Sequence, residues 1–185
     1  DGSVLFAGLT VMNGNLFFLV DNLSGFSFEL WKSDGTEAGT VLVTTVADFP
    51  AGLIGAGNTL FFTGGSQRDT ARGLFRTDGT AQGTFALGVG LASKLTVMSN
   101  LLFFVVLRPS AQDAGYELWK SDGTREGTFR FFSTIGGEAM ASLTPVGDTL
   151  FFTSFDADTG RELWKTDGTT AGTVRVKDIF PGSQS

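Results

Sequence analysis

The chain contains no histidine and no cysteine in its 185 residues. Without histidine it lacks the usual general base at neutral pH and the commonest metal ligand. Without cysteine it has no disulfides and no thiolate metal sites, whatever its compartment. It also lacks a Gly-x-Ser-x-Gly elbow and a phosphate-binding glycine loop. We therefore expect a protein that is not an enzyme.

Glycoside hydrolysis stays open in spite of these absences, because it needs only two carboxylates in different environments. The carboxylates outside the repeated motifs permit it without supporting it: Asp21, Asp69, Asp113, Glu138, Asp156 and Asp158.

Positive charge and long apolar runs are scarce as well. Thirteen basic residues face 19 acidic ones, for a net charge of −6, and they form no basic stripe. This distribution disfavours nucleic acid as a partner. The longest apolar run, Leu101–Leu107, has seven residues, far fewer than a membrane span needs. We expect neither nucleic-acid binding nor membrane insertion.

Glycine and phenylalanine are abundant, with 26 and 19 copies, and one phrase is repeated. Glu-Leu-Trp-Lys-Ser-Asp-Gly-Thr stands at Glu29–Thr36 and Glu117–Thr124, with one change at Glu162–Thr169, and in a worn form at Gly73–Thr80. Its aspartate falls at positions 34, 78, 122 and 167, so the steps are 44, 44 and 45 residues. A fixed period of this size indicates a repeat architecture.

A second block precedes each phrase. In each copy a leucine stands seven residues before a Leu-Phe-Phe, with a residue tolerant of positive φ between them: Leu9–Phe18, Leu53–Phe62, Leu95–Phe104 and Leu143–Phe152. This pattern predicts strand, tight turn, strand. The Glu-Leu-Trp-Lys segment and the apolar stretch after the second Gly-Thr predict two more strands. Each repeat is therefore expected to be a four-stranded antiparallel meander.

The consecutive apolar residues of Leu-Phe-Phe need cover on both faces of the strand, unlike an open sheet with one wet face. Four such units predict an all-β fold, a β-propeller of four four-stranded antiparallel blades. We expect one repeat domain over 1–185, with blades at 4–49, 50–91, 92–137 and 138–185. The four blades either close alone or form half of a larger propeller.

The connections divide into two sets. The first and third turns have the same length in every repeat, whereas the second turn and the link between repeats vary in length. In an up-and-down blade the first set lies on one rim and the second on the opposite rim. Variable loops on a rigid scaffold often carry binding. The aromatic and arginine residues offered there are Phe26, Phe28, Arg68, Arg72, Arg108, Tyr116, Phe155 and Arg161.

Three repeated positions invite a functional interpretation, but a structural one is favoured for each. The repeated aspartates would form a cation-binding ring or, as we expect, bond the N–H groups of their own turns. The aromatic position (Trp31, Phe75, Trp119, Trp164) suggests sugar stacking, but core packing is commoner. The basic position (Lys32, Arg76, Lys120, Lys165) shares a strand face with the aspartate, which predicts a modest ion pair.

One segment of the fourth repeat has carboxylates at alternate positions followed by a glycine, Asp156-Ala-Asp158-Thr-Gly160-Arg-Glu162. This pattern is similar to half of a calcium loop, with Asp156, Asp158 and Glu162 as ligands. The other repeats do not preserve it, which favours a polar turn. Apart from this calcium site, no cofactor is expected.

The repeated phrase, together with Val-Lys-Asp-Ile-Phe-Pro-Gly-Ser at Val176–Ser183, resembles the bacterial ELWxxDGT repeat family. In that family such a tract links one repeat to the next, so another blade is expected to follow. The resemblance implies a large secreted or surface-associated protein, often with longer arrays, and no established activity. The second repeat departs from the pattern at Gly73 and Phe75, and we expect its third strand to pack differently.

Two functions remain open. The first is a non-catalytic extracellular or cell-surface module that binds a glycan or a surface protein on the variable rim. The alternative is a structural repeat of a surface layer, a fibre or a longer propeller, with no soluble ligand. The chain starts at Asp1 without a methionine or a signal-type segment, so we expect a processed or excised piece of a longer chain. The structural alternative also predicts a homo-oligomer, in which two four-blade halves pair into an eight-blade ring.

Overall fold

The structure is a computed structural model that describes residues 6–21, 28–46, 50–65, 73–90, 92–108, 115–134, 139–179 and 181–182. Within these ranges all regular secondary structure is β-strand, which confirms the all-β prediction. The same ranges hold no helix long and apolar enough to cross a bilayer.

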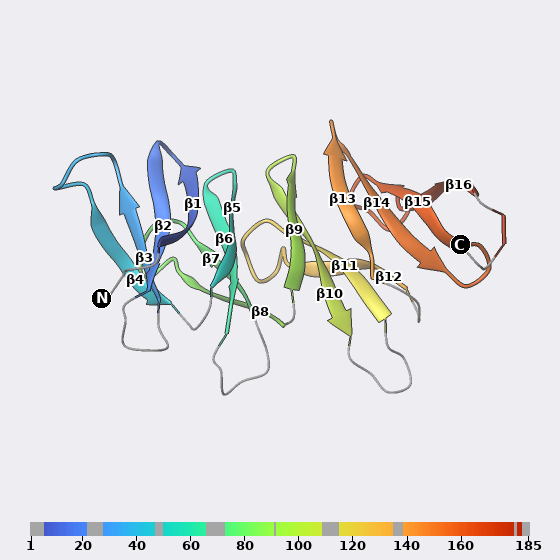
Figure 1. Ribbon diagram of the computed structural model, residues 1–185, viewed down its shortest axis with the longest axis horizontal. Coiled ribbons are helices and arrows are strands. Elements are labelled where there is room, and N and C mark those ends of the chain that lie inside the picture. Colours follow the sequence, from blue (N-terminus) through green and yellow to red (C-terminus); the bar gives the residue numbers. More distant parts are fainter. Residues whose placement is uncertain are drawn as a thin grey trace. The chain divides into compact units, whose positions relative to one another are not determined.

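The strands form four antiparallel four-stranded sheets, each in the order of its sequence (Figure 1). We call the sheets blades 1 to 4. Blade 1 has β1 (Phe6–Met12), β2 (Asn15–Asp21), β3 (Phe28–Ser33) and β4 (Val41–Val46). Blade 2 has β5 (Ala51–Ala56), β6 (Thr59–Gly64), β7 (Gly73–Thr77) and β8 (Phe85–Gly90). Blade 3 has β9 (Ala92–Met98), β10 (Leu101–Arg108), β11 (Gly115–Ser121) and β12 (Phe129–Ser133). Blade 4 has β13 (Ala141–Val146), β14 (Thr149–Asp156), β15 (Gly160–Thr166) and β16 (Val174–Lys177).

The chain divides into two compact units. Unit 1 is Asp1–Ala92 and contains blades 1 and 2, and unit 2 is Ser93–Ser185 and contains blades 3 and 4. Each unit is described by itself below. The expected single domain over 1–185 stays a prediction.

The first hairpin of each blade has the two-residue turn that the sequence predicts. Asn13 and Gly14 have φ angles of 51° and 74°, and Ser99 and Asn100 have angles of 50° and 61°. In blades 2 and 4 the glycine takes the positive φ, at 58° for Gly57 and 57° for Gly147. Positive φ at the first central position suits the right-handed twist of the two strands.

Cross-strand pairing places the constant connections at one end of every sheet. The start of each second strand pairs with the end of the third: Leu16 with Ser33, Leu60 with Thr77, Leu102 with Ser121, and Leu150 with Thr166. The first and third turns therefore lie together, on what we call the constant rim. The second turn and the inter-blade link lie at the other end, the variable rim.

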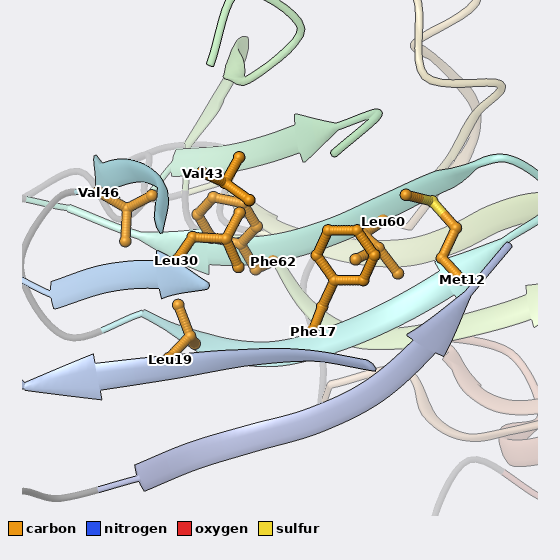
Figure 2. Packing of buried hydrophobic residues seen from close by; sticks show 8 residues of the cluster. All are labelled: Met12, Phe17, Leu19, Leu30, Val43, Val46, Leu60 and Phe62. Atoms are coloured by element: carbon orange, nitrogen blue, oxygen red, sulfur yellow. The ribbon is translucent and has the colours of Figure 1, made fainter. Parts of the chain in front are cut away.

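Each unit buries a core shared by its two blades. In unit 1, six side chains of blade 1 pack against Leu60 and Phe62 of blade 2 (Figure 2). The six are Met12, Phe17, Leu19, Leu30, Val43 and Val46. In unit 2, Leu150 and Phe152 of blade 4 pack in the same way against blade 3. All three residues of the second Leu-Phe-Phe, Leu60–Phe62, are at most 1% exposed. The expectation that this strand is covered on both faces is thereby confirmed for blade 2.

The first strand of each blade bends near its start. Register shifts fall between Ala7 and Thr10, between Ala51 and Ile54, and between Ala141 and Thr144. At these bends Gly8, Gly52 and Ser142 have positive φ, and Lys94 has it at the equivalent place in β9. A bulge of this kind increases the local twist of the strand.

Ser142→Gly is expected to raise the free energy of unfolding by up to about 1 kcal/mol. A non-glycine residue at positive φ destabilises the folded state by about 1–2 kcal/mol, and glycine removes this strain. Glycine also increases the entropy of the unfolded chain, which offsets about 0.5–1 kcal/mol of the stabilisation. Urea unfolding measures the change, with Ser142→Ala as a control that keeps the strain. A Gly variant less stable than the Ala variant would contradict the strain argument.

Candidate functional site

The repeated Asp-Gly-Thr forms the third turn of each blade, on the constant rim. In blade 3, Asp122 Oδ1 accepts hydrogen bonds from the backbone N–H and the hydroxyl of Thr124, both at 2.8 Å. The hydroxyl oxygen of Thr124 in turn accepts the N–H of Gly127 at 2.9 Å. The other three turns repeat this network with their own Asp, Thr and Gly residues.

Two glycines make this turn possible. Gly123 has a φ of 92°, a conformation that glycine adopts without strain. A Cβ on Gly127 would lie 2.1 Å from Asp122 Oδ1, so only glycine fits there. These contacts confirm that the repeated aspartate bonds its own turn. In the described part of the chain no group of three acidic residues is placed to hold a metal ion.

The same hydrogen bonds favour the ionised aspartate. For Asp34, Asp78 and Asp167 the threonine hydroxyl is the largest cause that lowers the carboxyl pKa below its ordinary 3.8, and for Asp122 it is the Thr124 N–H. A donor that bonds the charged form lowers the pKa of an acid.

We expect the protein to lose stability as the pH falls below about 4. The folded-state pKa of each turn aspartate lies below its unfolded value, so the stabilising effect is complete above the unfolded pKa and is lost as the pH falls through the folded pKa. Urea unfolding between pH 7 and pH 2.5 measures the slope. Asp122→Asn should reduce the slope, whereas Asp158→Asn, outside these turns, serves as the control. Equal slopes for wild type and Asp122→Asn would contradict the assignment.

The turn of the second blade in each unit completes a joint with the blade before it. In unit 1, Lys32 Nζ donates to the Gly79 carbonyl at 3.1 Å. A Cβ on Gly79 would lie 3.0 Å from Cζ of Phe17, so this glycine packs directly on the ring. Because Phe17 pairs with Lys32 across β2 and β3, the ring and the ammonium group share one face of blade 1.

Unit 2 repeats the joint. Lys120 Nζ donates to the Gly168 carbonyl at 2.7 Å, and a Cβ on Gly168 would lie 3.1 Å from Cζ of Phe103. Phe103 pairs with Lys120 across β10 and β11. We call this arrangement the Phe–Lys/Gly joint. One blade contributes a face with phenylalanine and lysine, and the next contributes the glycine of its turn.

The joint corrects one expectation. An ion pair between the basic residue and the aspartate of the same repeat is wrong for Lys32 and Lys120, which reach the following blade instead. The strands β3 and β11 end at Ser33 and Ser121, so the aspartate that follows lies in the turn and bonds the threonine of that turn instead of the lysine. In the worn repeat the expected pair does form, with Arg76 Nη1 at 3.6 Å from Asp78 Oδ2.

The worn repeat keeps a stacked aromatic pair at its third strand, and the expectation that this strand packs differently stays a prediction. Phe75 stacks on Phe62 with ring centroids 5.4 Å apart and planes 10° apart. The tryptophans of blades 3 and 4 stack on their own phenylalanines at 6.2 and 6.4 Å, with planes 29° and 26° apart. Arg76 donates to the Gly83 carbonyl in its own turn at 3.1 Å.

The repeated aromatic position belongs to the packing of the sheets. Phe75 and Trp164 lie against the shared cores of units 1 and 2. The indole N–H of Trp31 donates to Glu29 at 2.8 Å, and that of Trp119 donates to Glu117 at 2.9 Å. These contacts agree with core packing rather than with a sugar platform.

Blade 4 breaks the Trp–Glu pattern. Glu162 Oε2 accepts the backbone N–H of Ile179 at 3.0 Å. Nε1 of Trp164 is buried and has no hydrogen-bond partner among the described residues. Glu162 therefore binds the segment that follows β16.

Trp164→Phe is expected to cost less stability than Trp119→Phe. Both changes remove packing area, but only Trp119 loses a hydrogen bond to a carboxylate and leaves a buried acceptor behind, worth about 1–3 kcal/mol. Thermal and urea unfolding of the two variants, with Trp31→Phe as a second hydrogen-bonded case, measure the difference. Equal losses for Trp164 and Trp119 would contradict this account.

The predicted ligand-binding residues of the variable rim fall into three groups. Phe26, Arg68 and Arg72 lie outside the described residues. Phe28 packs against the core of unit 1, and Tyr116 packs against that of unit 2. The others, Arg108, Phe155 and Arg161, lie at the ends of strands in unit 2. Their role in binding stays a prediction.

Both arginines of this last group make structural contacts. Arg108 Nη1 lies 3.9 Å from Glu117 Oε1, and its side chain is 27% exposed. Arg161 Nη1 donates to the Ala139 carbonyl at 3.1 Å, just before β13. Arg161 also pairs with Phe155 across β14 and β15.

The segment suggested for calcium is a hairpin turn. Asp156 Oδ1 accepts the N–H of Asp158 at 2.9 Å and the hydroxyl of Thr159 at 3.3 Å. Glu162 is 2% exposed and bonds Ile179. A polar turn accounts for these contacts, and calcium binding by Asp156, Asp158 and Glu162 stays a prediction.

One surface depression in unit 2 was not foreseen from the sequence. It has a volume of about 380 Å³ and is lined by Arg130, Phe131, Phe132, Ser133 and Thr170. Thr170 Oγ1 donates to the Phe131 carbonyl at 2.8 Å, so a turn of blade 4 closes the edge of β12. The available signal was that Thr170 replaces the residues Glu37, Ala81 and Arg125 of the other turns.

No protein-family model and no curated protein matches the chain. Solved structures do. The β-propeller domain of the Trilobed protease from Pyrococcus furiosus matches with a TM-score of 0.61 at 7% identity, over 97% of this chain and 58% of that one. The chain has a β-propeller fold. Acylaminoacyl peptidase from Pyrococcus horikoshii matches with a TM-score of 0.60 at 9% identity, over 97% of this chain and 33% of that one.

A putative dipeptidyl aminopeptidase IV from Bacteroides ovatus gives a TM-score of 0.59 at 11% identity, over 95% of this chain and 29% of that one. The propeller chain therefore spans about a third of these peptidases and about three fifths of the Trilobed protease domain. At such identities the likeness concerns the fold alone.

Proposed function

We propose that the protein is a non-catalytic propeller module that binds a glycan or a surface protein through its variable rim. This proposal rests on the hydrogen bonding of the constant rim, whose polar groups bond one another. Each of its third turns uses the aspartate, the threonine and the glycine N–H in the same internal network. Four copies of one internally bonded turn offer little to distinguish ligands, whereas the connections of the opposite rim differ in sequence from repeat to repeat.

We further propose that the protein belongs to the ELWxxDGT repeat family and works outside the cell or at its surface. The three near-verbatim copies of the repeated phrase support membership. The propeller fold is the architecture that this resemblance implies. The location follows from the resemblance alone.

Peptidase activity is not part of the proposal. The neighbours named as peptidases share only the fold with this chain, at 9% and 11% identity. The sequence has no histidine and no cysteine, so neither a Ser-His-Asp nor a Cys-His arrangement can be built from it.

A second candidate function is a structural section of a larger propeller or surface assembly. The length of the matched propeller domain favours it. The match includes 97% of this chain but only 58% of the Trilobed protease domain, so that domain is longer. A four-blade stretch can thus be continued by further blades in a protein of this fold.

Arg108→Ala is expected to weaken a ligand found on a glycan array, or on a panel of purified surface proteins, by about tenfold or more. Loss of one charged contact in a binding site costs about 1.4 kcal/mol or more, which is tenfold in affinity. Arg125→Ala is the matched control, because Arg125 lies in a constant-rim turn. Melting temperatures of both variants separate lost contacts from lost stability. Equal binding by the two variants, or no binding to either panel, would argue against the variable rim.

A further inference from the structure

Blade 4 carries one half of a Phe–Lys/Gly joint. Phe151 pairs with Lys165 across β14 and β15, in the register that Phe17 has with Lys32 and Phe103 has with Lys120. Phe17 and Phe103 are 2% and 1% exposed. Phe151 is only half-buried, and Lys165 is exposed, with no hydrogen bond or ion pair to the described residues.

Blade 1 carries the other half. Gly35 has a φ of 93°, close to the 89° of Gly79 and of Gly168, so its turn has the shape that enters the joint. A Cβ on Gly35 would meet nothing within 4 Å, whereas on Gly79 or Gly168 it would touch a phenylalanine ring at 3.0 or 3.1 Å. Gly35 is exposed, while Gly79 and Gly168 are buried.

We propose that the Phe151–Lys165 face of blade 4 binds the Asp34-Gly35-Thr36 turn of a second copy of this chain. Lys165 then donates to the Gly35 carbonyl of that copy, and Phe151 packs on the bare Cα, as in the two joints inside the units. The proposal deepens the second candidate function and is independent of ligand binding on the variable rim.

The chemistry of the joint specifies the occupant. A partner must present a carbonyl to the lysine and, beside it, a residue without a Cβ, because the ring lies about 3 Å from where that atom would be. The Gly35 turn fulfils both requirements. Each copy carries both halves at different places, so the contact is heterologous, and it builds either a closed ring or an open chain of molecules.

Sedimentation velocity over a range of protein concentrations tests the proposal. We expect the wild-type protein to associate as the concentration rises. Lys165→Glu removes the donor and repels the turn carbonyl, and Gly35→Asn adds a Cβ where the ring must pack. Asparagine tolerates positive φ better than other side chains do. Each variant alone should stay a monomer.

Two matched variants show what the same changes do inside a unit. Lys120→Glu and Gly79→Asn alter complete joints, so they should lower the melting temperature more than Lys165→Glu and Gly35→Asn do. The φ angles of Gly35 and Gly79, 93° and 89°, make the backbone strain of the two asparagine variants equal. The difference in their melting temperatures then reports the joint alone.

Sedimentation of a mixture of Lys165→Glu and Gly35→Asn gives the most specific test. The Lys165→Glu chain keeps its turn, and the Gly35→Asn chain keeps its face, so the pair can form one intact joint. We expect the mixture to give a 1:1 dimer and nothing larger, although neither variant associates alone.

Three outcomes would overturn the proposal. One is a wild-type monomer at all concentrations, and another is association that neither variant reduces. The third is a monomer whose melting temperature falls with Lys165→Glu as much as with Lys120→Glu, because the blade 4 face would then be covered within one chain. Ligand binding measured on the same variants tests the variable rim separately.

Discussion

The internally bonded Asp-Gly-Thr turn is the interaction on which the rest of each unit depends. Its aspartate and threonine hold the backbone so that one glycine takes positive φ, as at Gly79, and the carbonyl of that glycine faces the preceding blade. The joint uses this carbonyl and the missing Cβ of the same glycine. Hydrogen bonds local to one hairpin thus prepare a contact that spans 47 residues of sequence. A looser turn would lose both the hairpin and the packing between blades.

Much of the fold was predictable because its signals are local. The two-residue turns, the Leu-Phe-Phe strands and the turn aspartate each depend on residues within one hairpin, where spacing and φ tolerance decide the outcome. The partner of the repeated lysine was not predictable in this way. The spacing of Lys32 and Asp34 suggested an ion pair on one strand face, but β3 ends at Ser33, so Asp34 lies in the turn and bonds Thr36. The partner of Lys32 is Gly79 on another blade. The spacing of residues in the sequence gives their positions within one strand, but it does not show which residues of another sheet contact them.

The candidate site was predictable only as a region. Antiparallel geometry alone assigns the variable connections to one end of each sheet, and the pairing of Arg108 with Gly115 and of Asp156 with Gly160 agrees. The roles of single residues there depend on tertiary contacts. Arg161 is predicted from the sequence as a ligand-binding residue, and in the structure it donates to the Ala139 carbonyl. Aromatic and charged residues near a loop can contact either the scaffold or a ligand, and the residue type alone does not show which.

Repeats with one sequence need not have one environment. Phe17, Phe103 and Phe151 hold the same place in the repeated block, yet the first two are covered by a glycine turn of the next blade and Phe151 remains half-buried. In stacked repeats each unit contacts its neighbours, so the surroundings of a repeated residue depend on the blade that lies against it. Blade 4 keeps both Phe151 and Lys165 in the register of the two joints inside the units, which is the composition of a surface that binds another blade.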